Sequence, residues 1–509
     1  MKNKTLKKIL STAAVAVLCV SLTACSSDAA TVTDETTAAE TIMNEEAADK
    51  PEGEAPGEKP DGDAPDGEGR EKGGHGKGGP GEDGSGKGAP GEGGPGGFGG
   101  GNSSADIDYK GATEITSADT RDGETYSSTT ADESALYIST SDAVTISNAT
   151  VTKTGDSDGG DNCNFYGLNA AVLVKDGSTT TISGATITSD ADGANGVFSY
   201  GGNGARNGGE GDGTTVIISD SVITTTGDGS GGIMTTGGGI TKASNLTVTT
   251  SGRSSAAIRT DRGGGTVTVD SGSYTTNGLG SPAIYSTADI TVSNATLTSN
   301  LSEGVCIEGM NSITLENCNM TANNTQCNGN ATFYDTIMIY QSMSGDADSG
   351  TSTFSMTGGS LTSKNGHVFH VTNTNAVINL RQVKITNEDA DKILLSVCDD
   401  GWEGASNIAT VNADSQTLSG TILVGDNSAL TLNLTNGSSF TGCISGAITN
   451  AKGDTVSSEV GEVAVTLDSS STWTLTSDTY VTSFDGDASC IIANGYTLYV
   501  NGTALSGTR

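Results

Sequence analysis

A short phrase recurs nine times between Val144 and Ile385, at intervals too short for separate domains. Each copy holds an apolar residue, a spacer, a second apolar residue, a small turn pair and a third apolar residue. The copies are VTISNATV (144–151), TTISGATI (180–187), VIISDSVI (216–223), TKASNLTV (241–248), VTVDSGSY (267–274), ITVSNATL (290–297), ITLENCNM (313–320), FSMTGGSL (354–361) and INLRQVKI (378–385). Apolar–polar alternation indicates β-strands, and a repeat of this length indicates a stacked architecture.

The spacing of the phrases gives the length of one coil. Their fourth residues are separated by 36, 36, 25, 26, 23, 23, 41 and 24 positions. The short steps predict a coil of 23–26 residues, and the long steps predict the same coil with inserted loops at 153–168, 189–213 and 323–351. The fifth position is Asn, Gly or Asp in seven of the nine phrases. These residues tolerate left-handed backbone geometry, so a tight bend is expected there.

A third apolar strand precedes the phrases, as in ALYI (135–138), AVLV (171–174) and GVCI (304–307). Three strands per coil predict an all-β solenoid whose coils pair as parallel strands about 4.8 Å apart. One inward column is expected to hold Val144, Val216, Val267, Ile290, Ile313 and Ile378. A β-sandwich is the alternative, but a sandwich requires no constant coil length.

From about Asp106 to the C-terminus, these Thr/Ser/Gly-rich coils resemble the right-handed parallel β-helix of the pectin-lyase-like superfamily, in particular its adhesin-like bacterial members. The resemblance implies a β-helix domain over 106–509, with an N-terminal cap and closing C-terminal coils around Trp473. It also implies a surface protein without enzymatic activity. A polysaccharide lyase or glycoside hydrolase of the same superfamily is the alternative, and a structural spacer is the third reading.

The first 24 residues have the form of a lipoprotein signal peptide. Four lysines among the first eight residues precede an apolar run at 9–20, which is too short to span a membrane. The following LTAC (22–25) resembles a bacterial lipobox and implies that Cys25 is the lipidated first residue of the mature chain. We therefore expect a protein anchored to a membrane, outside the cytoplasm and displayed at the cell surface.

Residues 25–105 are predicted to be a disordered linker. They hold seven of the eight prolines and many Gly-Glu and Gly-Lys pairs, so they have little apolar surface to bury. A flexible chain of about 80 residues reaches roughly 50 Å. The whole chain has 25 Lys and Arg against 61 Asp and Glu, a net charge of −36. Such a charge repels the phosphates of nucleic acids, so no nucleic-acid partner is expected.

Candidate ligand contacts lie at the outward position of the strand that precedes each phrase. The expected column is Tyr137, Leu173, Phe198, Met234, Arg259, Tyr285 and Cys306, with Met338 and Phe369 as further candidates. Aromatic faces pack on sugar rings, and Arg donates to hydroxyls or carboxylates. Tyr137, Phe198, Arg259, Tyr285 and Glu308 are thus predicted to line a carbohydrate-binding groove. The alternative is that the inserted loops fold over this column and bury it.

Acidic loops suggest calcium as the one candidate cofactor. The loops are GDSDGGDN (155–162), SDADGANG (189–196) and SGDADSG (344–350), and Asp alternating with Gly can wrap this ion. The candidate ligands are Asp156, Asp158, Asp161, Asp190 and Asp192. Plain solvated loops are the alternative.

No catalytic residue is assigned. A similarity to polygalacturonases would require two Asp followed by Gly-His-Gly, but the one Gly-His-Gly (74–76) lies upstream of Asp399 and Asp400. Glu308 with Asp261 is a carboxylate pair of the kind that cleaves glycosides, with solvated acids as the alternative. The leading hypothesis is therefore a surface protein that binds carbohydrate or host and envelope polymers.

Overall fold

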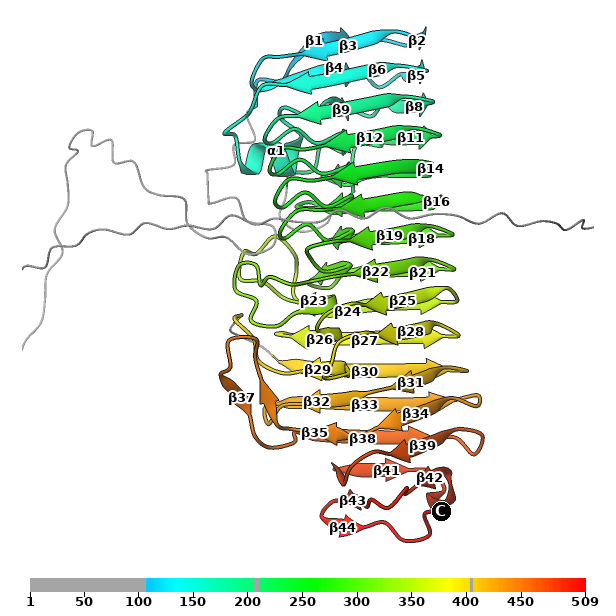
Figure 1. Ribbon diagram of the computed structural model, residues 1–509. Helices are drawn as coiled ribbons and strands as arrows, with labels where there is room; N and C mark the ends of the chain where they lie inside the picture. The colour runs from blue at the N-terminus through cyan, green and yellow to red at the C-terminus, as the bar shows by residue number, and fades with distance from the viewer. Residues whose placement is uncertain (1–106, 205–209, 403–405) are drawn as a thin grey trace, which may run out of the picture. The chain divides into compact units, whose positions relative to one another are not determined.

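The computed structural model describes residues 107–204, 210–402 and 406–509, all within one compact unit, Gly86–Arg509. The predicted signal peptide (1–24), Cys25 and the linker (25–105) lie outside the described residues. In the described part, no helix is both long and apolar enough to cross a membrane. Strand after strand stacks in parallel, which confirms the predicted parallel β-helix (Figure 1).

Each coil contributes strands to three parallel columns. Sheet A, with 13 strands, contains β1 (Lys110–Ile115), β4 (Glu133–Ser139), β7 (Val172–Lys175), β10 (Val197–Tyr200), β13 (Ile233–Thr236), β15 (Ile258–Thr260), β17 (Ile284–Ser286), β20 (Val305–Glu308), β23 (Asp335–Tyr340), β26 (His367–Thr372), β29 (Ile393–Val397), β32 (Thr421–Val424) and β35 (Ile444–Ser445).

The second and third columns form sheet B, because β14 and β16 run through both. The second contains β2 (Asp119–Asp122), β5 (Ala143–Ser147), β8 (Thr179–Ser183), β11 (Thr215–Ser219), β14 (Gly239–Thr250), β16 (Gly265–Thr276), β18 (Asp289–Ser293), β21 (Ser312–Glu316), β24 (Thr351–Thr357), β27 (Thr374–Arg381), β30 (Asn407–Asp414), β33 (Ser428–Thr435), β38 (Glu462–Leu467) and β41 (Ser483–Asp485). The third contains β3 (Thr125–Ser128), β6 (Thr150–Thr154), β9 (Thr186–Asp190), β12 (Val222–Thr225), β19 (Thr296–Ser299), β22 (Asn319–Ala322), β25 (Ser360–Ser363) and β28 (Lys384–Asn387).

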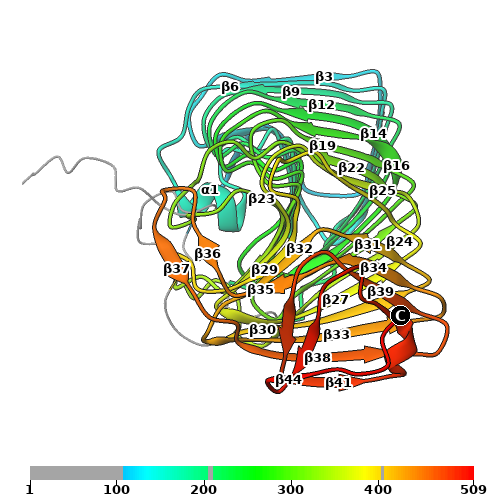
Figure 2. The ribbon, with the colours of Figure 1, turned by 60° about the horizontal axis from the view of Figure 1, so that its bottom comes forward.

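Later coils continue with smaller elements. Sheet C contains β31 (Thr417–Ser419), β34 (Ser439–Gly442), β39 (Thr472–Leu475) and β42 (Ile491–Ile492), and the last small sheet contains β40 (Thr479–Val481), β43 (Leu498–Val500) and β44 (Thr503–Ala504). Outside the columns lie α1 (Asp161–Tyr166), the 3-10 helix Ala488–Cys490 and the antiparallel hairpin of β36 (Ile448–Thr449) and β37 (Thr455–Ser457). Both α1 and the hairpin lie beside sheet A (Figures 1 and 2).

The core is built from the predicted columns. Val216 pairs in register with Thr241, which pairs with Val267, and the column continues through Ile290 and Ile313. These aliphatic residues are buried and belong to one continuous apolar cluster. β-branched side chains suit such stacking because their preferred rotamers pack well on a pleated surface.

The bends also follow the sequence. Asn148, Asn245 and Asn294 have φ of 52°, 50° and 57°, the left-handed geometry expected at the fifth position. Each donates its side-chain Nδ2, at 2.8 Å, to an Asp Oδ1 of the preceding coil. The choice of Asn therefore serves both the backbone conformation and the contact between coils.

The closing coils are held by aromatic packing. Trp473 is fully buried, stacks on Phe440 with ring centroids 5.6 Å apart, and donates its Nε1–H to the Gly442 carbonyl at 3.0 Å. Because its N–H has a partner, this large side chain fills the core without leaving a polar group unsatisfied.

Candidate functional site

The outer face of sheet A carries one continuous column of side chains. Strand register places in it Tyr137, Leu173, Phe198, Met234, Arg259, Tyr285, Cys306, Met338, His370, Ser396, Leu423 and Ser445. The predicted column is recovered with one correction. Phe369 pairs with core residues Ile337 and Leu395 and faces inward, so His370 takes the outward position.

The apolar start of this column is covered. Tyr137 and Phe198 are buried in a cluster with Leu173 and Met234. The covering segment includes α1, whose Phe165 and Tyr166 carbonyls accept hydrogen bonds from Thr236 Oγ1 (2.7 Å) and Tyr109 Oη (2.9 Å). The prediction of an open groove at Tyr137 and Phe198 is therefore wrong, and the covered alternative holds, because the inserted loop shields their apolar area from water.

The middle of the column is a buried charged network. Arg259 Nη2 lies 2.5 Å from Asp261 Oδ2, and both side chains are almost fully buried. The guanidinium also contacts Asn164 Oδ1 at 3.3 Å and packs over the Tyr285 ring at 5.4 Å. Burial raises the pKa of Asp261, although Arg259 favours its ionised form. Arg259 and Tyr285 therefore anchor the covering loop and do not face an external ligand.

Glu308 has a similar internal role. Its Oε2 accepts from Tyr285 Oη at 2.5 Å and from Tyr340 Oη at 3.1 Å. Its Oε1 accepts from Ser342 and from Ser344, the first residue of the third acidic loop (344–350). Burial raises the pKa of this carboxyl group. With Asp261 it was a candidate pair for glycoside cleavage, but both carboxylates lie beneath the covering loops.

The acidic loops connect coils. Asp156 Oδ1 accepts from the Asp192 amide at 3.0 Å, Asp192 Oδ1 accepts from the Asp228 amide at 2.7 Å, and Asp190 Oδ1 accepts from Thr226 Oγ1 at 2.5 Å. Of the other two candidates, Asp158 is exposed and Asp161 begins α1. Within the described ranges, no group of three or more His, Cys, Asp and Glu side chains is placed to hold a metal ion. The five predicted calcium ligands are not brought together there.

An open groove lies where the column leaves its cover, over the last strands of sheet A. It has a volume of about 970 Å³. Its walls are His367, Asp391, Ile393, Thr421, Leu423, Cys443, Ile444, Ser445, Gly446, Ala447, Thr449, Ser458, Glu459, Val460, Gly461, Ser477, Asp478, Tyr480, Val481, Thr482 and Asn501. Among these described lining residues there are three carboxylates and no Lys or Arg. We call this hollow the sheet A groove.

An aromatic platform stands in the wall of the sheet A groove. The Tyr480 ring is 52 % exposed and stacks on Tyr499, with centroids 4.7 Å apart and planes at 9°. The two residues pair directly across β40 and β43. The stacking holds the Tyr480 ring in place, so its free face is available without a large loss of side-chain entropy.

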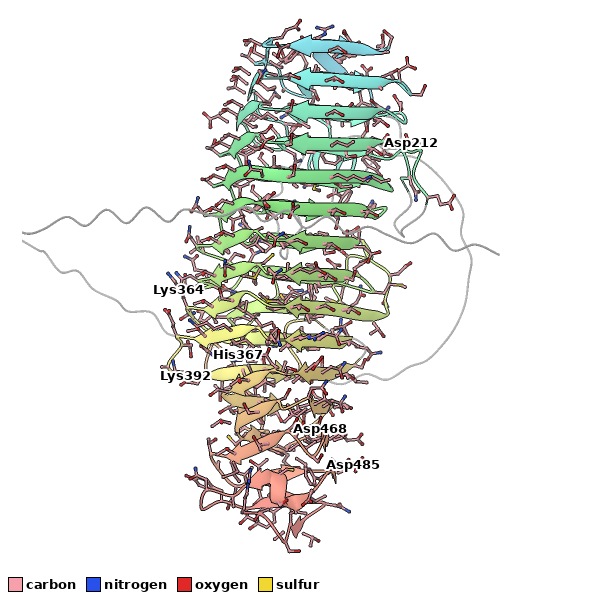
Figure 3. All side chains as sticks on the ribbon, turned by 90° about the vertical axis from the view of Figure 1, so that its right-hand side faces the viewer. Asp212, Lys364, His367, Lys392, Asp468 and Asp485 are labelled. Carbon is pink, nitrogen blue, oxygen red and sulfur yellow. The ribbon has the colours of Figure 1, made fainter. Side chains whose placement is uncertain are left out.

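A chain of polar side chains ends at the groove. His367 Nδ1 lies 2.7 Å from Ser396 Oγ, which lies 2.7 Å from His370 Nδ1. His370 Nε2 in turn lies 3.3 Å from Asp400 Oδ2. Burial, and next the neighbouring His370, lower the pKa of His367 to about 3. Figure 3 labels His367 together with Lys364 of the same coil and Lys392 of the next coil.

Asp400 is the fixed end of this chain. Its Oδ1 accepts from the Thr332 amide at 2.8 Å, from Thr332 Oγ1 at 2.6 Å and from the Gly401 amide at 2.7 Å. Burial disfavours its charged form, but the hydrogen bonds from His370 and Thr332 outweigh this and lower its pKa. Asp400 is therefore an ionised acceptor.

Sequence reasoning missed Ser396, His370 and the groove itself. The signal for His370 was the phrase HVFH (367–370), in which a shift of one residue in the strand register decides whether Phe369 or His370 faces outward. Burying the phenyl ring in the core and pairing the imidazole outside resolves that choice. Comparisons of the chain with protein-family models, with curated proteins and with solved structures find no match.

Proposed function

We propose that this protein binds a neutral carbohydrate polymer in the sheet A groove. The observation that carries the proposal is the lining: three carboxylates, several hydroxyls and an exposed tyrosine face, with no cationic side chain among the described lining residues. Carboxylates and hydroxyls accept hydrogen bonds from sugar hydroxyls, and an aromatic face packs on the apolar face of a sugar ring.

The charge of the lining selects against acidic polymers. Asp391, Glu459 and Asp478 would repel a uronate or phosphate, and the net charge of −36 acts in the same direction. The sheet A groove, with a volume of about 970 Å³, has room for a short segment of such a polymer. Neutral glycans are therefore favoured over pectate-like substrates.

The proposed setting is a bacterial envelope. The LTAC segment supports lipid attachment at Cys25, and the Gly/Pro-rich linker supports display of the β-helix away from the membrane. The resemblance of the coils to adhesin-like members of the pectin-lyase-like superfamily supports the same role. We infer a lipoprotein that holds host or envelope glycans outside the cytoplasm.

Titration calorimetry with the full chain tests this function. The probes are cellohexaose, xylohexaose, mannohexaose and, as the acidic comparison, hexagalacturonate. At least one neutral probe should bind, and Tyr480→Ala should weaken that binding about fivefold, because packing of a sugar ring on an aromatic face is worth about 1 kcal/mol. Tyr480→Phe should retain binding. Tyr496→Ala is the matched control, since Tyr496 is 41 % exposed but does not line the groove.

A glycoside hydrolase is the second candidate, because three carboxylates line the same groove and paired carboxylates cleave glycosidic bonds. A reducing-sugar assay on the same neutral probes distinguishes it. Sugar release that is lost in Asp391→Asn, Glu459→Gln or Asp478→Asn would replace the binding proposal. Neither binding nor release would favour the third reading, a structural spacer.

A further inference from the structure

His367 brings one ring nitrogen, Nε2, to the sheet A groove. His367 lines the groove, and its Nδ1 is engaged by Ser396. Within the described residues, its Nε2 makes no hydrogen bond. The buried Phe333 ring packs against both imidazoles, with centroids 5.3 Å from His367 and 4.8 Å from His370. The His367 ring is therefore held in one orientation by packing and by Ser396.

Asp400, at the buried end of this series of hydrogen bonds, sets the direction in which hydrogens are donated along it. Ionised Asp400 can only accept, so His370 Nε2 carries the hydrogen that it shares with Asp400. Their distance of 3.3 Å is longer than the 2.7–2.9 Å typical of a charged pair, and Asp400 already accepts three hydrogen bonds from neutral donors. A neutral His370 fits this geometry. Its Nδ1 then has a lone pair and accepts the hydroxyl hydrogen of Ser396.

The position of the hydrogen on His367 follows from that of Ser396. A serine hydroxyl has one hydrogen, and that of Ser396 is already donated to His370. The oxygen of Ser396 must therefore accept from His367, which places a hydrogen on Nδ1 of His367. His367 is neutral near pH 7, because burial, the largest cause, lowers its pKa to about 3. A neutral imidazole with a hydrogen on Nδ1 has a lone pair on Nε2.

We propose that His367 Nε2 is a fixed hydrogen-bond acceptor of the sheet A groove, which selects for ligands that present an O–H or N–H donor at this end. For a neutral glycan the donor is a sugar hydroxyl, so this inference rests on the proposed function for the identity of the ligand. Ser396, His370 and Asp400 act as positioning residues, because each sets the hydrogen of the next group and none of them lines the groove.

Nitrogen NMR tests the acceptor directly and without a ligand. The chain has three histidines, so labelling the full-length protein with ¹⁵N-histidine gives few signals, and His75→Gln and His367→Gln assign them. At pH 7 the His367 signals should show the Nδ1–H form, with an unprotonated Nε2. Signals of the Nε2–H form, or the averaged shifts of a freely exchanging imidazole, would overturn the proposal.

Ser396→Ala tests the positioning chain. The substitution removes the acceptor of the His367 Nδ1 hydrogen but leaves every groove-lining residue unchanged. We expect the His367 signals to move toward averaged shifts and the affinity for the bound neutral hexasaccharide to fall about threefold to tenfold. Ser286→Ala, a fully buried serine on β17 of the same sheet, is the control for the loss of a buried hydroxyl. Unchanged His367 signals in Ser396→Ala would contradict the role of Ser396 in placing the hydrogen on His367 Nδ1.

The two proposals fail separately. Should none of the four probes bind, the carbohydrate function fails, while the NMR form of His367 still decides the acceptor. Should a probe bind, His367→Phe must weaken it at least threefold while His367→Gln, whose amide oxygen can accept, retains more of the affinity. Equal binding by both variants and the wild type would show that the ligand does not use this acceptor.

Discussion

The outer face of sheet A is covered by inserted loops over the earlier coils and open to solvent at a groove over the last coils. Over the earlier coils it carries aromatic, charged and apolar side chains, and inserted loops cover them. Over the last coils it carries smaller groups such as Thr421 and Ser445 beside Leu423, which packs on Ile448 of the hairpin, and it lines an open groove. The difference teaches that an outward aromatic residue on a β-helix does not identify a binding face, because the same residue is a suitable anchor for a covering loop.

Energetics explain the division. A loop that lies over a strand must offset its ordering entropy by burying apolar area and satisfying polar groups. Tyr285, Glu308 and Arg259 provide both, through ring packing, hydroxyl–carboxylate contacts and an ion pair. The open part offers few such partners, so its side chains remain available to a ligand.

The largest effect is expected in the covered part. Arg259→Met leaves the Asp261 carboxyl group buried without its partner, which should lower the free energy of unfolding by about 3–5 kcal/mol. Urea denaturation followed by circular dichroism measures the change. The double variant Arg259→Met/Asp261→Leu should recover most of the loss, since no charge is then left unpaired. A single variant within about 0.5 kcal/mol of wild type would contradict a buried pair.

A smaller effect is expected where the third loop is attached. Glu308→Ala removes the acceptor of Tyr285, Tyr340 and Ser342, and should cost about 1–3 kcal/mol. Hydrogen–deuterium exchange should also become faster at 342–348, because that segment loses its attachment. Glu459→Ala, a carboxylate of the open groove, is the matched control and should change neither quantity. Equal effects from both variants would remove the contrast.

His367, at the boundary between the covered and open parts, should make the stability of the protein depend on pH. The folded pKa of His367, about 3, lies below its unfolded value of 6.5, so the unfolded state binds more protons in between. Its contribution to stability is complete above pH 6.5 and is lost as the pH falls toward 3, at up to about 1.4 kcal/mol per pH unit. Denaturation at pH 7, 6, 5 and 4 should show this slope as a difference between wild type and His367→Gln. Parallel curves for the two proteins would contradict a half-buried, neutral imidazole at His367.

The smallest effect is expected on the groove wall. Thr421→Ala removes a partly exposed side chain and should change the free energy of unfolding by less than about 0.5 kcal/mol. The same urea titration measures it. A loss above about 2 kcal/mol would mean that the groove wall is as closely packed as the covered part.

The fold could be predicted from the sequence because its rules are local. Alternation places Val216 and Ile218 inward, and Asn at the fifth position matches a left-handed bend. Repetition then supplies the register between coils. The closing position of Trp473 also followed, since a large aromatic residue near the end of the repeats suits the core.

The site could not be predicted in the same way. Whether Tyr137 faces solvent depends on the path of the inserted loop at 153–168, and sequence periodicity does not contain that path. The acids of 155–162 have the composition of cation ligands, yet Asp156 bonds to the backbone of the next coil. Asp400 reaches His370 through folding that brings together residues 30 positions apart. Only the geometry shows which polar residues meet.

The coil-to-coil use of Asp156, Asp192 and Asp228 has a consequence for how such a chain can change its length. Each carboxylate accepts from the amide at the equivalent point one turn further on, so losing or duplicating a fraction of a turn would break the contact across that junction. Whole turns can be gained or lost while these hydrogen bonds between coils are kept. Because neighbouring coils lie about 4.8 Å apart, each whole turn gained or lost would change the distance between the groove and the first strands by about 4.8 Å. Unequal recombination between repeats would change this distance and leave the groove-lining residues unaltered.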